Sequence, residues 1–218
     1  MEKTLNVHKK AKITVKSKLF FFLAGSFIAF ASILVNIFLQ KLLGLASIYT
    51  IGCKDISLLI HPFLSSIATG FFEEVIFRFV LLTFLIKAFK LNWLAILVGS
   101  LIFSLVHLGN SYITIIALIS HFLGGIIYSY AFVKTKEIWL PFGLHFGWNY
   151  TQIFFGIPMS GSAYYSIFVT NFHSLEYLNG GAYGFEGGIW SFYSRVIIFI
   201  ILLFVTKFSG LNSFLRNK

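Results

Sequence analysis

The sequence predicts an all-α, polytopic transmembrane helix bundle of about six spans. The 218-residue chain is 58% hydrophobic and only 11% charged, whereas soluble globular proteins carry about one quarter charged residues. Its apolar residues form long continuous runs, and its basic residues gather at the ends of those runs. Continuous runs are typical of membrane-spanning helices, so the pattern excludes a β-barrel and argues against strands.

Six apolar segments stand out, and the chain length suits about five to seven helices at about 20 residues per span. The second run begins near Pro62, a residue suited to a first helical turn, although residues 56–60 just before it are also apolar. The third run ends at the turn signal Gly109-Asn110, and Pro141 stands in the first turn of the fifth. The predicted spans are residues 19–39, 62–85, 93–108, 112–133, 138–155 and 189–208.

The net charge of +10 does not indicate a nucleic-acid partner. The basic residues flank apolar runs, as the positive-inside rule predicts for a protein surrounded by membrane lipid. They return to the N-terminal side after the second, fourth and sixth spans, so both termini are predicted to be cytoplasmic. The cations assigned to this inner side are Lys9, Lys10, Lys12, Lys16, Lys18, Lys87, Lys90, Lys134, Lys136, Lys207, Arg216 and Lys218, and those near the outer side are Lys41, Lys54 and Arg195.

The predicted organisation is a basic cytoplasmic segment, residues 1–18, followed by a single transmembrane domain, residues 19–218. An outer loop over about 157–188 is rich in Gly and Tyr and holds Glu176 and Glu186. Loops this long are often functional, and the stretch "GGAYGFEGG" is compatible with a mobile lid or a simple linker. Cys53 is the only cysteine, which excludes a disulfide framework and a thiolate metal cluster.

Three charged residues, Glu73, Glu74 and Arg78, lie within the second apolar run, in "FFEEVIFR". A charge at the bilayer centre costs about 3 kcal/mol on insertion scales, so we expect these side chains to line a polar cavity. Glu74 and Arg78 are spaced i, i+4 and can form an ion pair. Glu73 is rotated by about 100° around the helix, which makes it the candidate reactive group. The alternative is a salt-bridge cluster that merely holds helices together.

Further polar residues reach a similar depth. Counting along each span at about 1.5 Å per residue places Glu73, His107 and Asn149 in one layer, with His145 about one turn below. One carboxylate, two imidazoles and a carboxamide can polarise a water, accept its proton and stabilise an oxyanion. They can equally ligate a divalent metal ion. His121 lies at comparable depth and is interpreted as a packing or supporting residue.

Three motifs on successive spans resemble those of the CAAX prenyl proteases and bacteriocin-processing enzymes, also called abortive-infection proteins. The resemblance covers about 56–155, and Phe79 stands where many relatives have Gly. It implies an intramembrane endopeptidase in the cell membrane, multi-pass and bacterial in character, that cuts a membrane-associated peptide or protein. The motifs are Glu73-Glu74-x-x-x-Arg78, Phe103-x-x-x-His107 and His145-x-x-x-Asn149.

The resemblance also implies residue roles but leaves the cofactor open. The family has been described both as metalloproteases and as metal-free glutamate proteases. The resemblance therefore allows two cases. Either the site binds one divalent ion such as zinc, with Glu73, His107 and His145 as candidate ligands, or it binds no metal and uses a glutamate mechanism. The implied roles are water activation for Glu73, water binding for His107, oxyanion stabilisation for His145 and Asn149, and support of the site for Glu74 and Arg78.

Two other functions remain open at this point. A catalytically inactive relative could keep the site as a binding cavity and act as a bacteriocin-immunity or regulatory protein. An ion or proton transporter could use Glu73, His107 and His121 as a relay, since intramembrane carboxylates and histidines mark such pathways. The sequence contains no visible internal repeat, which argues against a transporter built from repeated halves.

Overall fold

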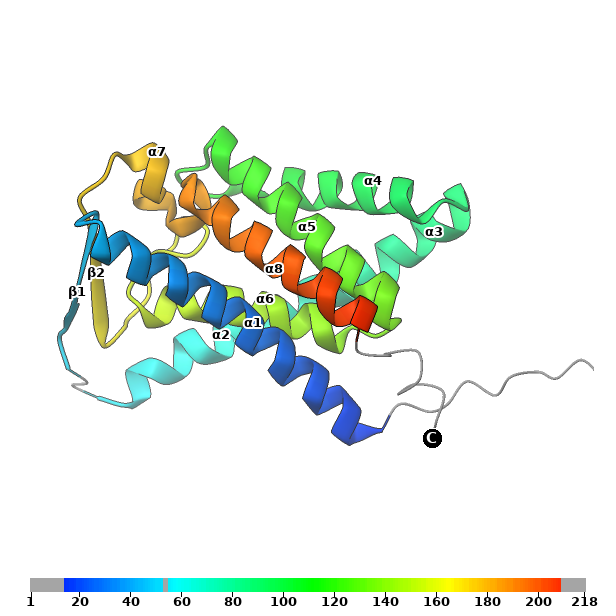
Figure 1. The fold of residues 1–218 in the computed structure, drawn as a ribbon, viewed down its shortest axis with the longest axis horizontal. Coiled ribbons are helices and arrows are strands. Elements are labelled where there is room, and N and C mark those ends of the chain that lie inside the picture. The colour runs from blue at the N-terminus through cyan, green and yellow to red at the C-terminus, as the bar shows by residue number, and fades with distance from the viewer. Residues whose placement is uncertain (1–13, 53–54, 209–218) are drawn as a thin grey trace, which may run out of the picture.

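The computed structural model describes residues 14–52 and 55–208, which form a helix bundle with one short sheet (Figure 1). The all-α class is confirmed. Lys9, Lys10, Lys12, Cys53, Lys54, Arg216 and Lys218 lie outside the described residues. The main elements are α1 (Val15–Leu42), α2 (Ser57–Glu74), the π-helix η1 (Val75–Leu82), α3 (Thr83–Phe89), α4 (Asn92–Leu105), the 3₁₀ turn η2 (Val106–Gly109), α5 (Ile115–Thr135), α6 (Trp139–Phe154) and α8 (Trp190–Phe208).

Within the part of the chain that the structure describes, three helical stretches are long and apolar enough to cross a membrane, judged by length and composition: Val15–Leu42, Asn92–Gly109 and Ile115–Thr135. A shorter apolar helix covers Trp190–Thr206. The start of α1 and the end of α8 lie at the same end of the bundle (Figure 1), as an even number of spans requires. The number of spans and the cytoplasmic placement of the termini stay predictions.

The second helix begins earlier than the sequence predicts. It starts at Ser57, so Pro62 lies inside α2 rather than in its first turn. Proline removes a single backbone donor, and an apolar environment favours a helix over exposed backbone groups. The hydroxyl of Ser66 donates a 2.9 Å hydrogen bond to the Pro62 carbonyl. The apolar residues 56–60 therefore extend this helix outward.

The helix that carries the charged motif changes its winding at that motif. Residues Val75–Leu82 are π-helical, between the α-helical stretches α2 and α3. A π-helix makes i→i+5 hydrogen bonds and occurs frequently at functional sites. The wider turn begins directly after Glu73 and Glu74 and contains Arg78, so it sets the direction in which these side chains leave the helix.

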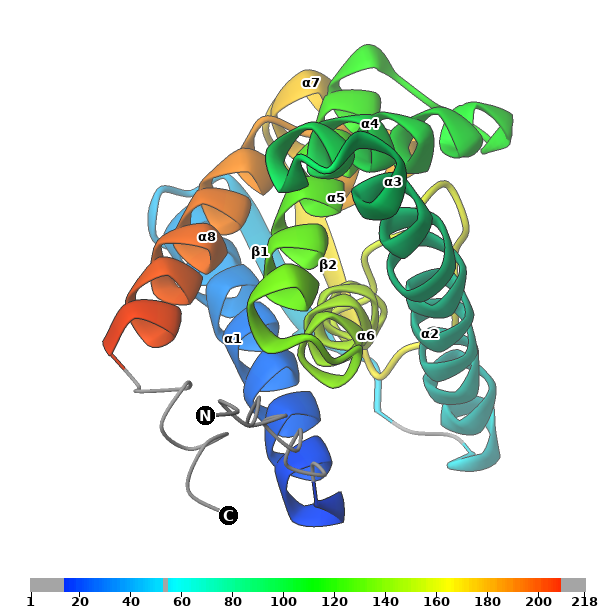
Figure 2. The ribbon, with the colours of Figure 1, turned by 90° about the vertical axis from the view of Figure 1, so that its right-hand side faces the viewer.

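Helix α6 occupies the centre of the bundle. Figure 2 shows it nearly end-on between α1, α5 and α2, and it packs against all three. Its closest approach is to α1, where a Cβ atom added at Gly143 or Gly147 would collide with the carbonyl of Phe22 or Ser26. Small residues let helix backbones pack this closely. The helix that carries two of the candidate site residues is thus held firmly.

The expectation of no strands was wrong for two short segments. Strands β1 (Ala46–Thr50) and β2 (Phe168–Phe172) pair antiparallel, with Ala46 opposite Phe172 and Thr50 opposite Phe168. Both contain β-branched and aromatic residues, which favour strands. Each strand is five residues long, and the partners become neighbours because the helix bundle brings the two loops together.

The outer loop is a packed part of the bundle rather than a simple linker. It contains β2, a one-turn helix α7 (Glu176–Asn179) and two 3₁₀ turns, η3 (Gly181–Tyr183) and η4 (Phe185–Gly187). Tyr183 and Phe185 are almost completely buried. Gly184 between them has φ +95°, and a Cβ there would collide with the Pro158 carbonyl. Glycine at this position allows the loop to fold inward.

Candidate active site

Four of the predicted site residues, Glu73, His107, His145 and Asn149, line one cavity of about 290 Å³. They come from α2, η2 and α6, so the predicted convergence of three helical segments is observed. The other two, Glu74 and Arg78, are 0% and 1% exposed. These four residues present one carboxylate, two imidazoles and a carboxamide to the cavity, with the Glu74–Arg78 ion pair buried beside them.

His145 lies between the two glutamates. Its Nδ1 is 2.8 Å from Glu74 Oε1, and its Nε2 is 3.8 Å from Glu73 Oε2. Because a carboxylate only accepts hydrogen bonds, Nδ1 is the donor to Glu74, and Nε2 of the neutral ring keeps its lone pair. The second distance is too long for a direct hydrogen bond, but it allows one water to contact both groups.

Arg78 supports the contact between Glu74 and His145 by pairing with Glu74. Its Nη1 lies 3.3 Å from Glu74 Oε1, which is the ion pair that the i, i+4 spacing predicts. The guanidinium also lies over the rings of Phe103 and Tyr128, at 4.3 and 5.2 Å from their centroids. Aromatic faces attract cations most strongly where water is excluded. Arg78 thus neutralises Glu74 and leaves Glu73 as the partly accessible carboxylate, with its side chain 25% exposed.

His107 is oriented by its own helix end. Its Nδ1 lies 2.7 Å from the Phe103 carbonyl oxygen. A carbonyl only accepts hydrogen bonds, so Nδ1 carries the proton and Nε2 is free to accept one in the neutral ring. The spacing Phe103-x-x-x-His107 therefore has a direct structural use, since it sets the tautomer of the imidazole. The Phe103 ring itself packs edge-on against His107, His121 and His145.

The three candidate metal ligands do not form a metal-binding group. Within residues 14–52 and 55–208, no set of three or more His, Cys, Asp or Glu side chains is placed to hold one ion. Glu73 and His145 approach each other, but no third His, Cys, Asp or Glu among the described residues completes a ligand set with them. The donor geometry of the described residues therefore does not fit a bound divalent ion.

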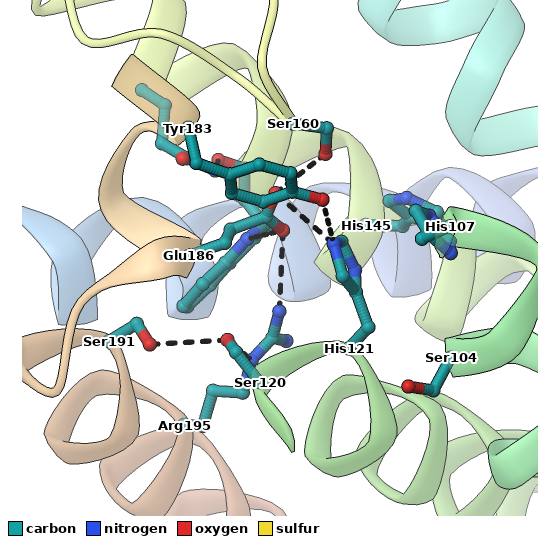
Figure 3. A network of polar contacts seen from close by, with 12 residues as sticks. Ser104, His107, Ser120, His121, His145, Ser160, Tyr183, Glu186, Ser191 and Arg195 are labelled. Atoms are coloured by element: carbon teal, nitrogen blue, oxygen red, sulfur yellow. Dashed lines mark hydrogen bonds and ion pairs between the residues drawn. The ribbon is translucent and has the colours of Figure 1, made fainter. Parts of the chain in front are cut away.

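The same cavity has a second polar centre that sequence reasoning missed (Figure 3). Arg195, assigned above to the outer interface, is 2% exposed and is paired with Glu186, which is 3% exposed, across 3.4 Å. Arg195 Nε donates to Ser120 Oγ at 3.0 Å, and its guanidinium lies 3.9 Å from the Trp148 ring centroid. The sequence carried one signal of this pair: each charge is isolated, with Glu186 among glycines and Arg195 within an apolar run.

Glu186 accepts hydrogen bonds at both carboxylate oxygens. Trp148 Nε1 donates to Oε1 at 2.7 Å, and Ser160 Oγ donates to Oε2 at 2.6 Å. Burial raises the pKa of Glu186, but the neighbouring His121, the Arg195 guanidinium and these hydrogen bonds outweigh it and lower the pKa to about 2. The glutamate is therefore ionised, and it anchors the outer loop to α6 and α8.

His121 also lies in this cavity and is more than a packing residue. Its ring is stacked on His107, with centroids 3.8 Å apart, and its Nε2 is hydrogen-bonded to the hydroxyl of Tyr183. No residue pairs with His121 at helical spacing, because its partners come from other segments. The two polar centres of the cavity are thus connected through two stacked imidazoles.

Comparison with known proteins agrees with the motifs. Residues 55–151 match the family model described as type II CAAX prenyl endopeptidase Rce1-like. No individual curated protein and no solved structure has significant similarity to the chain. The matched segment contains Glu73, Glu74, Arg78, His107, His145 and Asn149 and ends before Glu186 and Arg195.

Proposed function

We propose, from the premise that the chain belongs to the family of CAAX prenyl proteases and bacteriocin-processing enzymes, that it is an active intramembrane endopeptidase. It hydrolyses a peptide bond in a membrane-associated peptide or protein, and it does so as a multi-pass protein of the cell membrane. The observation that carries the proposal is the placement of His145 between Glu73 and Glu74 beside the cavity. Nothing in a purely structural salt bridge requires an imidazole nitrogen directed at a second, partly accessible carboxylate.

The nucleophile is a water molecule held between Glu73 and the imidazoles. Glu73 accepts a proton as the water oxygen attacks the carbonyl carbon of the scissile bond. His107 accepts a hydrogen bond from the same water at Nε2, because its Nδ1 proton is committed to the Phe103 carbonyl. Positioning the water against both groups reduces the entropy cost of the attack.

The oxyanion is stabilised from α6. His145 and Asn149 are one helical turn apart and both line the cavity, so both can direct a donor at the carbonyl oxygen. When the His145 ring takes a second proton from solvent before the attack, Nδ1 still donates to Glu74 and Nε2–H faces the developing negative charge. Arg78 pairs with Glu74 Oε1, which holds the carboxylate in the position that orients the ring.

The intermediate collapses with the proton that Glu73 has taken. Glu73 donates this proton to the leaving amide nitrogen and the C–N bond breaks. The products are a carboxylic acid and an amine, and the acid then releases its remaining proton to the amine or to solvent. One carboxylate thus acts first as base and then as acid. Every atom of the reaction comes from water and the peptide bond.

The test is peptidase activity of the purified protein in proteoliposomes. The substrates are fluorogenic and membrane-tethered peptides, and the variants are Glu73→Gln and Glu73→Ala. Removing a general base lowers the rate by about 10²- to 10⁴-fold, so we expect a loss in that range with unchanged thermal unfolding. The matched control is Glu176→Gln, which alters an exposed glutamate of the outer loop. Equal turnover by the Glu73 variants and the unaltered protein would refute the proposal.

A cellular assay separates the active protease from an inactive regulatory relative. We expect Glu73→Gln to abolish the phenotype of the protein at normal expression, because the phenotype depends on hydrolysis. A regulator or immunity protein that only binds a partner would keep its phenotype with this nearly isosteric change.

A further inference from the structure

We propose that His121 is a positioning residue for His107, and that the outer loop holds His121 in place through Tyr183 and Glu186. The inference rests on the proposed function, because it concerns how the water-binding imidazole is oriented. It assigns a role in the reaction to a histidine and a loop that lie outside the three family motifs.

His107 needs support beyond its own helix. It lies in the short 3₁₀ turn η2 at the end of α4 and is only partly buried. Its one hydrogen bond to the described residues runs from Nδ1 to the Phe103 carbonyl. A single bond at one nitrogen still allows the plane of the ring to rotate about the direction of that bond. A reacting group must be held within a narrow range of orientations.

The stack on His121 removes that freedom. The two imidazoles are nearly parallel, with an interplanar angle of 19° and centroids 3.8 Å apart. His121 itself is 3% exposed and sits within a long helix, α5. A rigid, buried ring thus supports one face of a partly exposed ring, while the Phe103 ring packs edge-on against both.

The Tyr183 hydroxyl joins both sides of this stack. It is hydrogen-bonded to His121 Nε2, and it accepts a 3.2 Å hydrogen bond from Asn110 Nδ2. Asn110 directly follows the turn that carries His107. One hydroxyl therefore fixes the supporting ring and also ties down the segment whose ring is supported, as Figure 3 shows for Tyr183 and His121.

Glu186 completes the attachment. Its Oε2 lies 3.9 Å from His121 Nε2, and its oxygens accept hydrogen bonds from Trp148 on α6 and Ser160 in the loop. This carboxylate keeps η3 and η4 inside the bundle, which places Tyr183 over His121. The loop therefore forms a fixed wall of the cavity. Glu186 holds the loop in place, Tyr183 of the loop holds His121, and His121 holds the ring of His107.

The experiment compares His121→Phe with His121→Ala. Phenylalanine keeps a flat ring against His107 but has no nitrogen, whereas alanine removes the ring. We expect His121→Ala to lower kcat by about 10- to 100-fold, as loss of a group that orients a reacting residue does, with little change in KM. His121→Phe should recover most of that loss. His173→Ala, in an exposed histidine outside the cavity, is the matched control.

The same comparison can overturn the inference. If His121→Phe is as inactive as His121→Ala, the nitrogens of His121 carry a proton or bind a ligand, and positioning by stacking is wrong. Full activity of His121→Ala is also incompatible with it. Tyr183→Phe, which removes a single oxygen, should lower kcat less than His121→Ala does, and unchanged kcat in this variant would contradict the role of the loop.

A second readout does not depend on activity. In protein labelled with ¹³C-histidine, the His107 Cε1–H resonance, assigned with His107→Gln, should carry a ring-current shift from His121. We expect this shift to vanish in His121→Ala and to persist in His121→Phe. If the unaltered protein hydrolyses no peptide but the shifts behave as expected, the proposed function fails and the positioning stands. If it is active and the resonance does not respond, the positioning fails.

Discussion

His145 on α6 and Glu74 on α2 are joined by a 2.8 Å hydrogen bond from Nδ1 to Oε1. The bond crosses between two helices, and both side chains are buried. It fixes which face of the imidazole meets the cavity and which nitrogen is available there. Glu74, which the i, i+4 spacing pairs with Arg78, therefore has a second partner, His145, that decides the geometry of the site.

This bond predicts a graded response at Glu74. Glu74→Gln can still accept the Nδ1 hydrogen bond, but it loses the charge that supports a protonated His145 and pairs with Arg78. We expect kcat to fall by about 10- to 100-fold, as for other groups that orient a reacting imidazole, with KM nearly unchanged. The measurement is steady-state peptidase kinetics, with Glu137→Gln as the control. A variant with normal kcat would show that the Glu74 charge is dispensable.

The donor geometry predicts insensitivity to metal removal. The described residues bring no three metal-binding side chains to one point, so the proposed route uses Glu73 and imidazole groups. We expect peptidase activity to remain within about twofold after dialysis against a strong chelator, since no Lewis acid supplies part of the rate. Mass spectrometry of metal content on the same preparation is the companion measurement. Chelator-dependent loss that zinc restores would overturn the metal-free route.

The contact between α1 and α6 predicts a stability effect at Gly143. A Cβ there would collide with the Phe22 carbonyl, and backbone cannot yield as a flexible side chain can. Overpacking typically costs about 1–3 kcal/mol, so Gly143→Ala should unfold at a clearly lower temperature in detergent. Gly109→Ala is the control, because nothing lies within 4 Å of its Cβ position. Equal stability of the two variants would argue against this close helix contact.

The Glu186 anchor predicts acid sensitivity. The pKa of this glutamate is lowered from 4.5 to about 2 in the folded protein. The ionised carboxylate therefore stabilises the fold above about pH 4.5, and this contribution declines as the pH falls towards 2, because the unfolded chain binds the proton first. We expect Glu186→Gln to lower stability at neutral pH and to flatten the pH dependence across that window. Thermal unfolding at several pH values measures both effects, and an unchanged slope would contradict the anchor.

The class of protein and the core of the site could be predicted from the sequence. The few charges and long apolar runs indicate a membrane helix bundle. A charged side chain within such a run requires a polar partner. Helical periodicity then pairs Glu74 with Arg78 and places His145 and Asn149 on one face of α6. These inferences depend on local spacing along one helix, which the chain itself specifies.

Other features depended on the tertiary structure. The pairing of β1 with β2 and the stack of His107 on His121 join groups whose separation in sequence says nothing of their separation in space. The burial of Arg195 was missed for this reason, because burial depends on what packs over a residue, and its partner Glu186 comes from the outer loop. The π-helical turn after Glu74 is local in sequence, but no residue pattern in the chain indicated it. Spacing along one helix is fixed by backbone geometry, whereas contacts between segments are selected by how the whole bundle packs.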